Sequence, residues 1–540
     1  MPKLSRIYYT QIIFLLCSVL YVLRRPDMLF NPQPWAEDGA VFISDHLSKG
    51  ISAFIHNYAG YLHFFPRIFT FISVELSEIL GAGLQLTPLI MNVLAITTSV
   101  LCVLYILSPS FDWLSSYKTR ALSAIAIILI PTIPEVYGNA TNLHWWLGVF
   151  QFLVTLHIWK WKKYPPLLIS SLFLLSGLSG PSFFVAAFLI FLIISVNYFK
   201  VHHLSKRTLL FGLATLFVTL VQLTLSLIYR SISTENSPDF HGFMAYFPRA
   251  FFVGIFDRIF LWNFQEVVNY VLMPTSVLIG GIILLLLTYI NLSRIRFFIF
   301  SILYIVLLML ITFIGANFIF GLYVDPFIDL GQRYLFIPVA IALILLFTSF
   351  NNKNRSTQIV YSFMCCVVSI NMITNFQLDP FEDYKWREAV KNYSATSTNL
   401  CEVAINPPEW KMYIPCDTSE TEVIEFVDSH NQILGYFDES HYDGTYLSGQ
   451  GWAISPVTGK PADEVIITDS NHRILAHTWV KKKRPDVAEH FQDDNKLRSG
   501  WSFKAQVFGL TPEDKIFAYV YVPEEKKAYK LENDFSVVID

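Results

Sequence analysis

The sequence predicts a polytopic α-helical membrane protein that carries a soluble β-sheet domain after its last membrane span. Hydrophobic residues make up 54% of the 540 residues and charged residues only 15%, which leaves too little polar surface for a soluble chain. Long apolar segments fill residues 1–378, and the composition becomes polar from residue 379 onward. We therefore predict two domains, 1–378 and 379–540.

The first domain contains about eleven apolar segments, each long enough to cross a hydrocarbon core of about 30 Å. The first segment follows a charged start, and no small-residue cleavage site comes after it. We therefore predict a retained helix rather than a cleaved signal peptide. The segments are 7–23, 85–107, 121–137, 143–159, 165–179, 183–199, 208–229, 269–290, 297–320, 333–349 and 356–375.

Short connectors between these segments carry clusters of lysine and arginine, and the positive-inside rule places such connectors in the cytoplasm. Counting crossings back from them puts the N-terminus in the cytoplasm and the domain 379–540 outside. The connectors are 160–163, 200–207, 293–296 and 351–355.

Residues 24–83 then form one external loop. The segment 64–80 within it is apolar enough to span the membrane but carries three charged side chains, Arg67 among them. If this segment crossed the membrane, the first helix would have to begin outside the cytoplasm. We therefore predict an interfacial helix with its charges toward water. Arg24 and Arg25 at the start of this loop run against the positive-inside rule.

We predict that the domain 379–540 is a small β-sandwich. Several segments have the length and the β-branched and aromatic bias of strands, and turn residues separate them. Cys401 and Cys416 are its only cysteines. A disulfide between them would contribute roughly 3 kcal/mol in an oxidising compartment. Trp452, Trp479 and Trp501 could stack on a glycan or belong to the core of the sandwich.

This arrangement resembles the GT-C glycosyltransferases, and most closely the bacterial type that modifies O-antigen or other surface glycan. The resemblance covers nearly the full length, but few residues carry it. They are WAEDG (35–39), TNLHWW (141–146), GQRYLFIP (331–338) and DYKWREA (383–389).

The resemblance implies an inverting transfer of a hexose from an undecaprenyl-phosphate-linked sugar to a glycan acceptor. The reaction would take place at the external face of the bacterial cytoplasmic (inner) membrane, in contact with membrane lipid. Nucleic acid is not an expected partner, because the net charge is −3 and the basic residues are scattered.

Such a transfer needs a base for the acceptor hydroxyl and a cation for the departing phosphate. Glu37 and Asp38 are the candidates for the catalytic base, because adjacent acids near an apolar surface raise the pKa of one of them. We favour Asp38. Alternatively, the two acids only begin the helix that follows, where they suit the positive end of the helix dipole.

Arg333 and Tyr334, at the mouth of a predicted span, are candidates for binding the donor phosphate. Arg67 and His63 form a second candidate pair. Simple contact of these side chains with the membrane interface is the alternative. Arg249 and Arg258 are further cations on the external side.

Asn142, His144 and Trp145 are candidates for binding the sugar or the acceptor, since an aromatic face beside amide and imidazole groups suits a pyranose ring. An ordinary interfacial aromatic belt is the alternative. Glu135 is a further buried-acid candidate.

The histidines and cysteines do not have metal-binding spacing, so we predict no metal site and no required cofactor. A divalent cation, Mg²⁺ or Mn²⁺, held by Glu37, Asp38 and the donor phosphate remains an alternative. Two other functions compete with glycosyl transfer: a flippase or polymerase for polysaccharide, and a non-catalytic scaffold that presents a glycan-binding sandwich.

Overall fold

The computed structural model divides the chain into two compact units. The helical unit comprises Met1–Glu388 and Ala404–Met412, and the sheet unit comprises Ala389–Val403 and Tyr413–Asp540. The structure describes residues 3–131, 133–201, 205–233, 247–261, 273–320, 329–351, 354–395, 397, 400–416, 425–428, 433–442, 446–470, 472, 474–507, 510 and 514–537.

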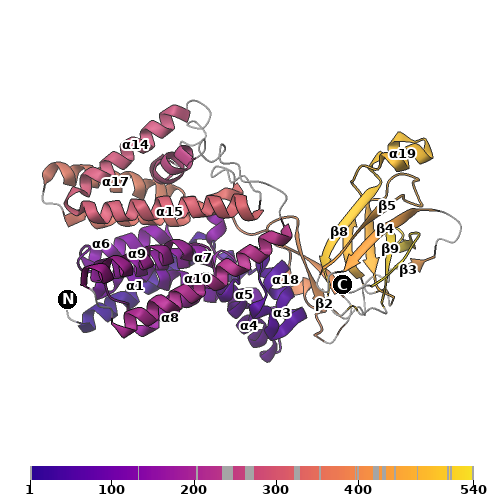
Figure 1. The fold of residues 1–540 in the computed structure, drawn as a ribbon, viewed down its shortest axis with the longest axis horizontal. Coiled ribbons are helices and arrows are strands. Elements are labelled where there is room, and N and C mark those ends of the chain that lie inside the picture. The colour runs from indigo at the N-terminus through magenta and orange to yellow at the C-terminus, as the bar shows by residue number, and fades with distance from the viewer. Residues whose placement is uncertain are drawn as a thin grey trace. The chain divides into compact units, whose positions relative to one another are not determined.

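Helices make up most of the helical unit (Figure 1). The main ones are α1 (Lys3–Arg24), α2 (Asp27–Phe30), α3 (Ser44–Lys49), α4 (Phe64–Ile79), α5 (Thr87–Leu104), α6 (Tyr117–Ile128), α7 (Leu143–Trp161), α8 (Leu167–Gly177), α9 (Phe183–Val201), α10 (Lys206–Ser233), α12 (Arg258–Leu261), α14 (Met273–Ile290), α15 (Ile295–Phe320), α16 (Phe336–Phe347), α17 (Arg355–Thr374) and α18 (Trp386–Ala389). The π-helical segments η1 (Asp38–Ile43) and η6 (Arg249–Asp257) and the 3₁₀ segment η9 (Asp329–Leu335) complete the elements used below.

The core of the helical unit lies along α7 and α16. All of α16 is buried, and so are the sixteen consecutive residues 143–158 of α7. α16 is apolar on every side, as expected for a helix that other helices surround, whereas α7 also buries polar side chains such as Gln151 and Thr155. α7 packs against α5, α8, α9 and α16. The outer helices instead expose large apolar side chains, such as Leu210 and Phe217 of α10. Such an apolar exterior is typical of a surface in contact with lipid.

Seven helices in the described part of the chain are long and apolar enough to cross a membrane. Their length and composition support the prediction of a membrane protein with several spans. The seven are Leu4–Arg24, Thr87–Leu107, Phe183–Lys200, Lys206–Ile228, Leu292–Thr312, Gln332–Phe350 and Arg355–Thr374.

The other four predicted spans differ from these seven. Segments 165–179 and 269–290 contain the shorter apolar helices Leu167–Gly177 and Val277–Ile290, and residues 269–272 lie outside the described ranges. α7 covers 143–159 but is interrupted by polar side chains. The helix predicted over 121–137 ends at Ile128, because the prolines that follow it cannot continue a helix.

The two arginines that run against the positive-inside rule are buried at the end of α1. The Arg24 guanidinium donates to the carbonyls of Ile128 and Ile130, at 3.0 and 2.7 Å. It also donates to the Phe376 carbonyl at 3.1 Å. Arg25 donates in the same way to the carbonyl oxygens of Pro134, Tyr137 and Asp379. These arginines therefore satisfy carbonyl groups that helix ends and turns leave without partners.

The strands of the sheet unit form two larger sheets and one strand pair. The six-stranded sheet has the order β3-β10-β9-β6-β7, with β11 also on β9, and the three-stranded sheet has the order β4-β5-β8. The pair is β1-β2. The strands are β1 (Leu400–Ile405), β2 (Trp410–Pro415), β3 (Glu425–Val427), β4 (Gly435–Tyr442), β5 (Tyr446–Ala453), β6 (Glu464–Thr468), β7 (Ile474–Trp479), β8 (Gly500–Gln506), β9 (Lys515–Val522), β10 (Lys527–Lys530) and β11 (Phe535–Ser536).

One hydrophobic cluster joins residues of the two larger sheets. Phe437 and Trp501 come from the three-stranded sheet, and Ile467 and Val520 come from the six-stranded sheet. Cys401 and Cys416 form a disulfide within the same unit. The structure therefore confirms a C-terminal region of β-sheets.

The three tryptophans that could stack on a glycan differ in exposure. Trp452 and Trp501 are buried, whereas Trp479 is 55% exposed. Trp452 and Trp501 therefore serve the core, and only Trp479 has a face open to a ligand.

Candidate functional site

Asp38 begins η1 and is buried, with 2% of its surface exposed. Its Oδ2 accepts a hydrogen bond from the Ala140 N–H at 2.9 Å. Its Oδ1 accepts from the N–H and the hydroxyl of Thr141, each at 2.7 Å. Burial raises the pKa of Asp38 to about 7, although these three donors act in the opposite direction. The carboxylate thus fastens the segment between α2 and α3 to the turn that precedes α7.

The same turn is held by its own amide side chains. Asn139 and Asn142 both donate to the Glu135 carbonyl oxygen, at 2.8 and 3.0 Å. The Asn142 N–H donates to Asn139 Oδ1 at 2.9 Å, and Asn142 Oδ1 accepts from Trp145 Nε1 at 3.2 Å. Both ends of the Asn142 amide are therefore engaged in orienting Trp145 and Glu135.

Arg333 forms an ion pair with the Glu135 carboxylate. η9 carries Arg333 to the turn before α7, although the two residues lie 198 positions apart in the sequence. The guanidinium carbon lies 5.6 Å from the centre of the Tyr334 ring, and that ring meets Trp145 edge to face at 5.3 Å. A guanidinium carries five N–H groups, so Arg333 can bind a second anion beside Glu135.

Glu37 precedes Asp38, and no hydrogen bond from another residue to its carboxylate is seen in the described part of the chain. Burial raises the pKa of Glu37, and the positive charge of Arg333 lowers it. The Glu37 charge also contributes to raising the pKa of Tyr61, for which burial is the main cause. Glu37, Arg333 and Tyr61 therefore act on one another electrostatically.

Aromatic rings connect this group to the two histidines that the sequence singled out. The Tyr61 ring stacks on His63 with ring centres 3.9 Å apart and meets His144 edge to face at 6.1 Å. His144 in turn lies 4.4 Å from the Trp145 ring. Burial lowers the pKa of His63 well below its ordinary value, so its imidazole is neutral at pH 7.

The surroundings of His144 determine which of its ring nitrogens carries a proton. Its Nδ1 lies 2.9 Å from the Thr141 carbonyl oxygen, which can only accept, so Nδ1 carries a proton. In a neutral ring this leaves Nε2 as an acceptor for a hydroxyl group.

Arg67 does not belong to this group, contrary to its assignment as a phosphate ligand that faces water. Its side chain is buried, and Nη1 donates to Asp45 Oδ2 at 2.9 Å. Lys49 Nζ donates to the other oxygen of Asp45 at 2.5 Å. Arg67 Nε donates to the Leu62 carbonyl at 3.1 Å. The pair joins α3 to α4, and the Asp45 carboxylate compensates the buried charge of the guanidinium.

Replacing Arg67 with Met should lower the stability of the helical unit by about 2 kcal/mol. Breaking a buried pair typically costs roughly 3–5 kcal/mol, and the loss is smaller here because Lys49 still neutralises Asp45. The measurement is the thermal unfolding midpoint of the full chain in detergent, and Arg296→Met, at an exposed arginine, is the control. Unchanged stability would show that the pair with Asp45 does not hold the two helices together.

The structure thus brings together most of the predicted site residues at one place in the helical unit. Glu37, Arg333, Tyr334, His63, His144 and Trp145 take part in one connected group, and Asp38 and Asn142 hold its framework. The sequence reasoning did not name Tyr61 or Thr141, although they belong to the motifs YLHFFPR and TNLHWW. The side chains of Arg249 and Arg258 lie outside the described residues.

Among the described residues, no three histidine, cysteine, aspartate or glutamate side chains lie close enough to share a metal ion. Asp38 fits poorly as a ligand because three donors already occupy its oxygens. Comparisons of the chain with protein-family models, curated proteins and solved structures found no match.

Proposed function

We propose that this protein is an inverting glycosyltransferase that moves a hexose from a polyprenyl-phosphate donor to a surface glycan. The single observation that carries the proposal is the grouping of Glu37 with Arg333, Glu135 and the rings of Tyr61, Trp145 and Tyr334. A carboxylate, a phosphate-binding guanidinium and aromatic faces are the three kinds of group that this reaction needs.

Glu37 is the base in this proposal. It removes the proton of the acceptor hydroxyl while that oxygen forms a bond to the anomeric carbon of the donor sugar. The bond from the anomeric carbon to the phosphate oxygen breaks, and its electron pair leaves with the polyprenyl phosphate. Attack from the side opposite to the leaving group inverts the configuration at the anomeric carbon.

Arg333 stabilises the phosphate in the proposed reaction as its negative charge grows. Glu135 holds the guanidinium in place before the donor binds, because the ion pair orients Arg333. Trp145 and Tyr334, which meet edge to face, offer a wall for the sugar ring. The Nε2 of His144 can accept a hydrogen bond from a sugar hydroxyl.

The hydrogen bonds favour Glu37 over Asp38 as the base, in contrast to the preference drawn from the sequence. Asp38 already accepts three hydrogen bonds and is nearly inaccessible. Asp38 is a positioning residue in the proposal, because it fixes the loop from which Glu37 extends. No step of the proposed reaction passes through a divalent cation.

The proposal includes eleven membrane spans, a C-terminal β-sandwich and a location in the bacterial inner membrane with the site on the external face. The seven membrane-length helices and the two larger sheets with their common hydrophobic cluster are consistent with it. An external site matches a donor sugar that is presented on a lipid carrier.

The test uses a deletion strain and complementation with variants of the full chain. Wild type should restore a branch sugar to the surface glycan, and Arg333→Ala should lower incorporation about 100-fold. Arg333→Lys, which keeps the charge but loses the fork of N–H groups, should recover part of the activity. Rates are measured in membranes with undecaprenyl-phosphate donors labelled with glucose, galactose or mannose.

Other outcomes of the same experiment identify the competing functions. Loss of the whole surface glycan in the deletion strain would indicate a flippase or polymerase. An unchanged glycan would indicate a scaffold. Normal incorporation by Arg333→Ala would refute the role of the guanidinium.

A further inference from the structure

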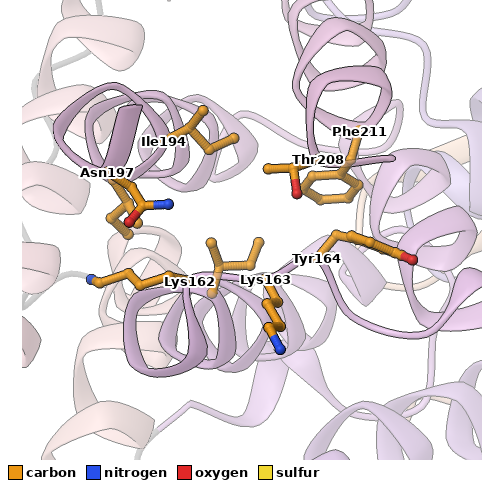
Figure 2. A pocket seen from close by; sticks show the side chains of 9 residues that line it. Lys162, Lys163, Tyr164, Ile194, Asn197, Thr208 and Phe211 are labelled. Atoms are coloured by element: carbon orange, nitrogen blue, oxygen red, sulfur yellow. The ribbon is translucent and has the colours of Figure 1, made fainter. Parts of the chain in front are cut away.

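A pocket lies in the helical unit at the end of α7, between the last turns of α9 and the first turns of α10 (Figure 2). Its walls are apolar where the helices face one another and include Ile158, Ile194 and Phe211. Two lysines stand at its edge, and their side chains point away from its middle in different directions (Figure 2). The pocket therefore combines an apolar interior with a basic rim.

The basic rim consists of Lys162 and Lys163 in the connector after α7. In the part of the chain that the structure describes, neither lysine takes part in an ion pair with a carboxylate. Burial lowers the pKa of Lys162, and the positive charge of Lys200 lowers it further. An anion placed beside Lys162 would relieve its repulsion from Lys200.

The chain segment that lines the pocket carries no opposite charge to serve this purpose. The sequence from 151 to 211 has no aspartate or glutamate, while it includes six lysines and arginines. Arg207, one of them, donates to the Tyr164 hydroxyl at 3.1 Å, and Tyr164 also lines the pocket. An anion from outside the protein is therefore the natural partner.

Apolar surface continues from the pocket along the outside of the helices. Phe199 of α9 and Leu210 of α10 are 72% and 64% exposed. Both helices are long and apolar enough to cross a membrane. A molecule bound at the rim would thus reach directly onto a surface suited to hydrocarbon chains.

We propose that this pocket binds an anionic phospholipid of the surrounding bilayer. The phosphate lies beside Lys162 and the amide of Asn197, Lys163 and the hydroxyl of Thr208 contact the polar headgroup, and an acyl chain follows Ile194 and Phe211. A phospholipid joins a fixed negative charge to long apolar chains, which matches the basic rim and the apolar side chains beside it. This site is separate from the proposed transfer reaction and does not depend on it.

The test measures lipid binding to the purified full chain in detergent by native mass spectrometry. Wild type should retain phosphatidylglycerol in preference to phosphatidylcholine. Lys162→Gln/Lys163→Gln should weaken phosphatidylglycerol binding about tenfold. The matched control is Lys391→Gln/Lys460→Gln, which removes two exposed lysines elsewhere and should change nothing.

A second pair of variants tests the cavity rather than the charge. Ile194→Trp fills the pocket while keeping both lysines and should also displace phosphatidylglycerol. Leu213→Trp places the same side chain on the exposed side of α10 and should not. Inorganic phosphate at equal concentration should not compete. Equal loss with the two lysine pairs, retention by Ile194→Trp, or competition by phosphate alone would overturn the proposal.

Discussion

Glu37→Gln should lower the turnover number of sugar transfer about 10³-fold and leave the thermal unfolding midpoint within about 1 °C of wild type. The amide has nearly the same shape as the carboxyl group but cannot take the acceptor proton. Its folding role is small, since no hydrogen bond from another residue to this carboxylate is seen among the described residues. The measurement is the initial rate with the labelled undecaprenyl-phosphate donor that gives transfer with wild type.

The control for this substitution is Glu78→Gln, at an exposed acid that ends α4 in the same predicted external loop. It should retain wild-type turnover. Turnover near wild type in Glu37→Gln would remove this residue as the base. A loss confined to KM would show instead that Glu37 only binds the acceptor.

Asp38→Ala should lower the stability of the helical unit by about 3–6 kcal/mol. Three donors, the N–H groups of Ala140 and Thr141 and the Thr141 hydroxyl, would lose their acceptor in a buried place, at roughly 1–3 kcal/mol each. Transfer should fall as well, because the loop that carries Glu37 loses its attachment. The measurement is the thermal midpoint together with turnover at a temperature well below it.

Asp38→Asn separates stability from chemistry if Asp38→Ala does not fold. Its Oδ1 can still accept from Thr141, whereas its amide N–H₂ group faces the Ala140 N–H without a bond. We expect a loss of about 2 kcal/mol and turnover reduced less than in Glu37→Gln. Turnover reduced about 10³-fold in a well-folded Asp38→Asn would make Asp38 the base.

The stability of wild type relative to Asp38→Asn should depend on pH. The pKa of Asp38 is raised to about 7 in the folded chain, so between pH 4 and pH 7 the folded state binds more protons than the unfolded state. The contribution of the protonated Asp38 carboxyl to the free energy of unfolding is therefore fully present below pH 4. It is lost as the pH rises through 7. The difference in thermal midpoint between wild type and Asp38→Asn should be larger at pH 5 than at pH 8.

The sequence predicted a membrane protein from its long apolar segments, because the structure of such segments depends little on tertiary context. The sequence predicted the ends of the helices less accurately than their presence. Helix α6, for example, ends at Ile128, before the predicted end at residue 137. Two prolines stand within the predicted span 121–137, and their effect on the helix outweighed its hydropathy. The count of eleven spans remains a prediction.

The site could be predicted in part because its residues stand in short polar motifs between apolar spans. The sequence could not assign partners, however. Arg67 pairs with Asp45, 22 positions away, and Arg333 pairs with Glu135, 198 positions away. The same limit applies to Asp38, since nothing in WAEDG indicates that Thr141 would occupy its carboxylate. Distant pairing decides which charged groups serve structure and which remain for chemistry.

The arginines at the end of α1 affect the time course of synthesis. Arg24 leaves the ribosome before its carbonyl partners, which follow 104, 106 and 352 residues later. At about 5–20 residues per second, the last partner emerges some tens of seconds after the arginine. Helix α1 is therefore made well before it can reach its final contacts, and a chain that stops before residue 376 cannot complete them.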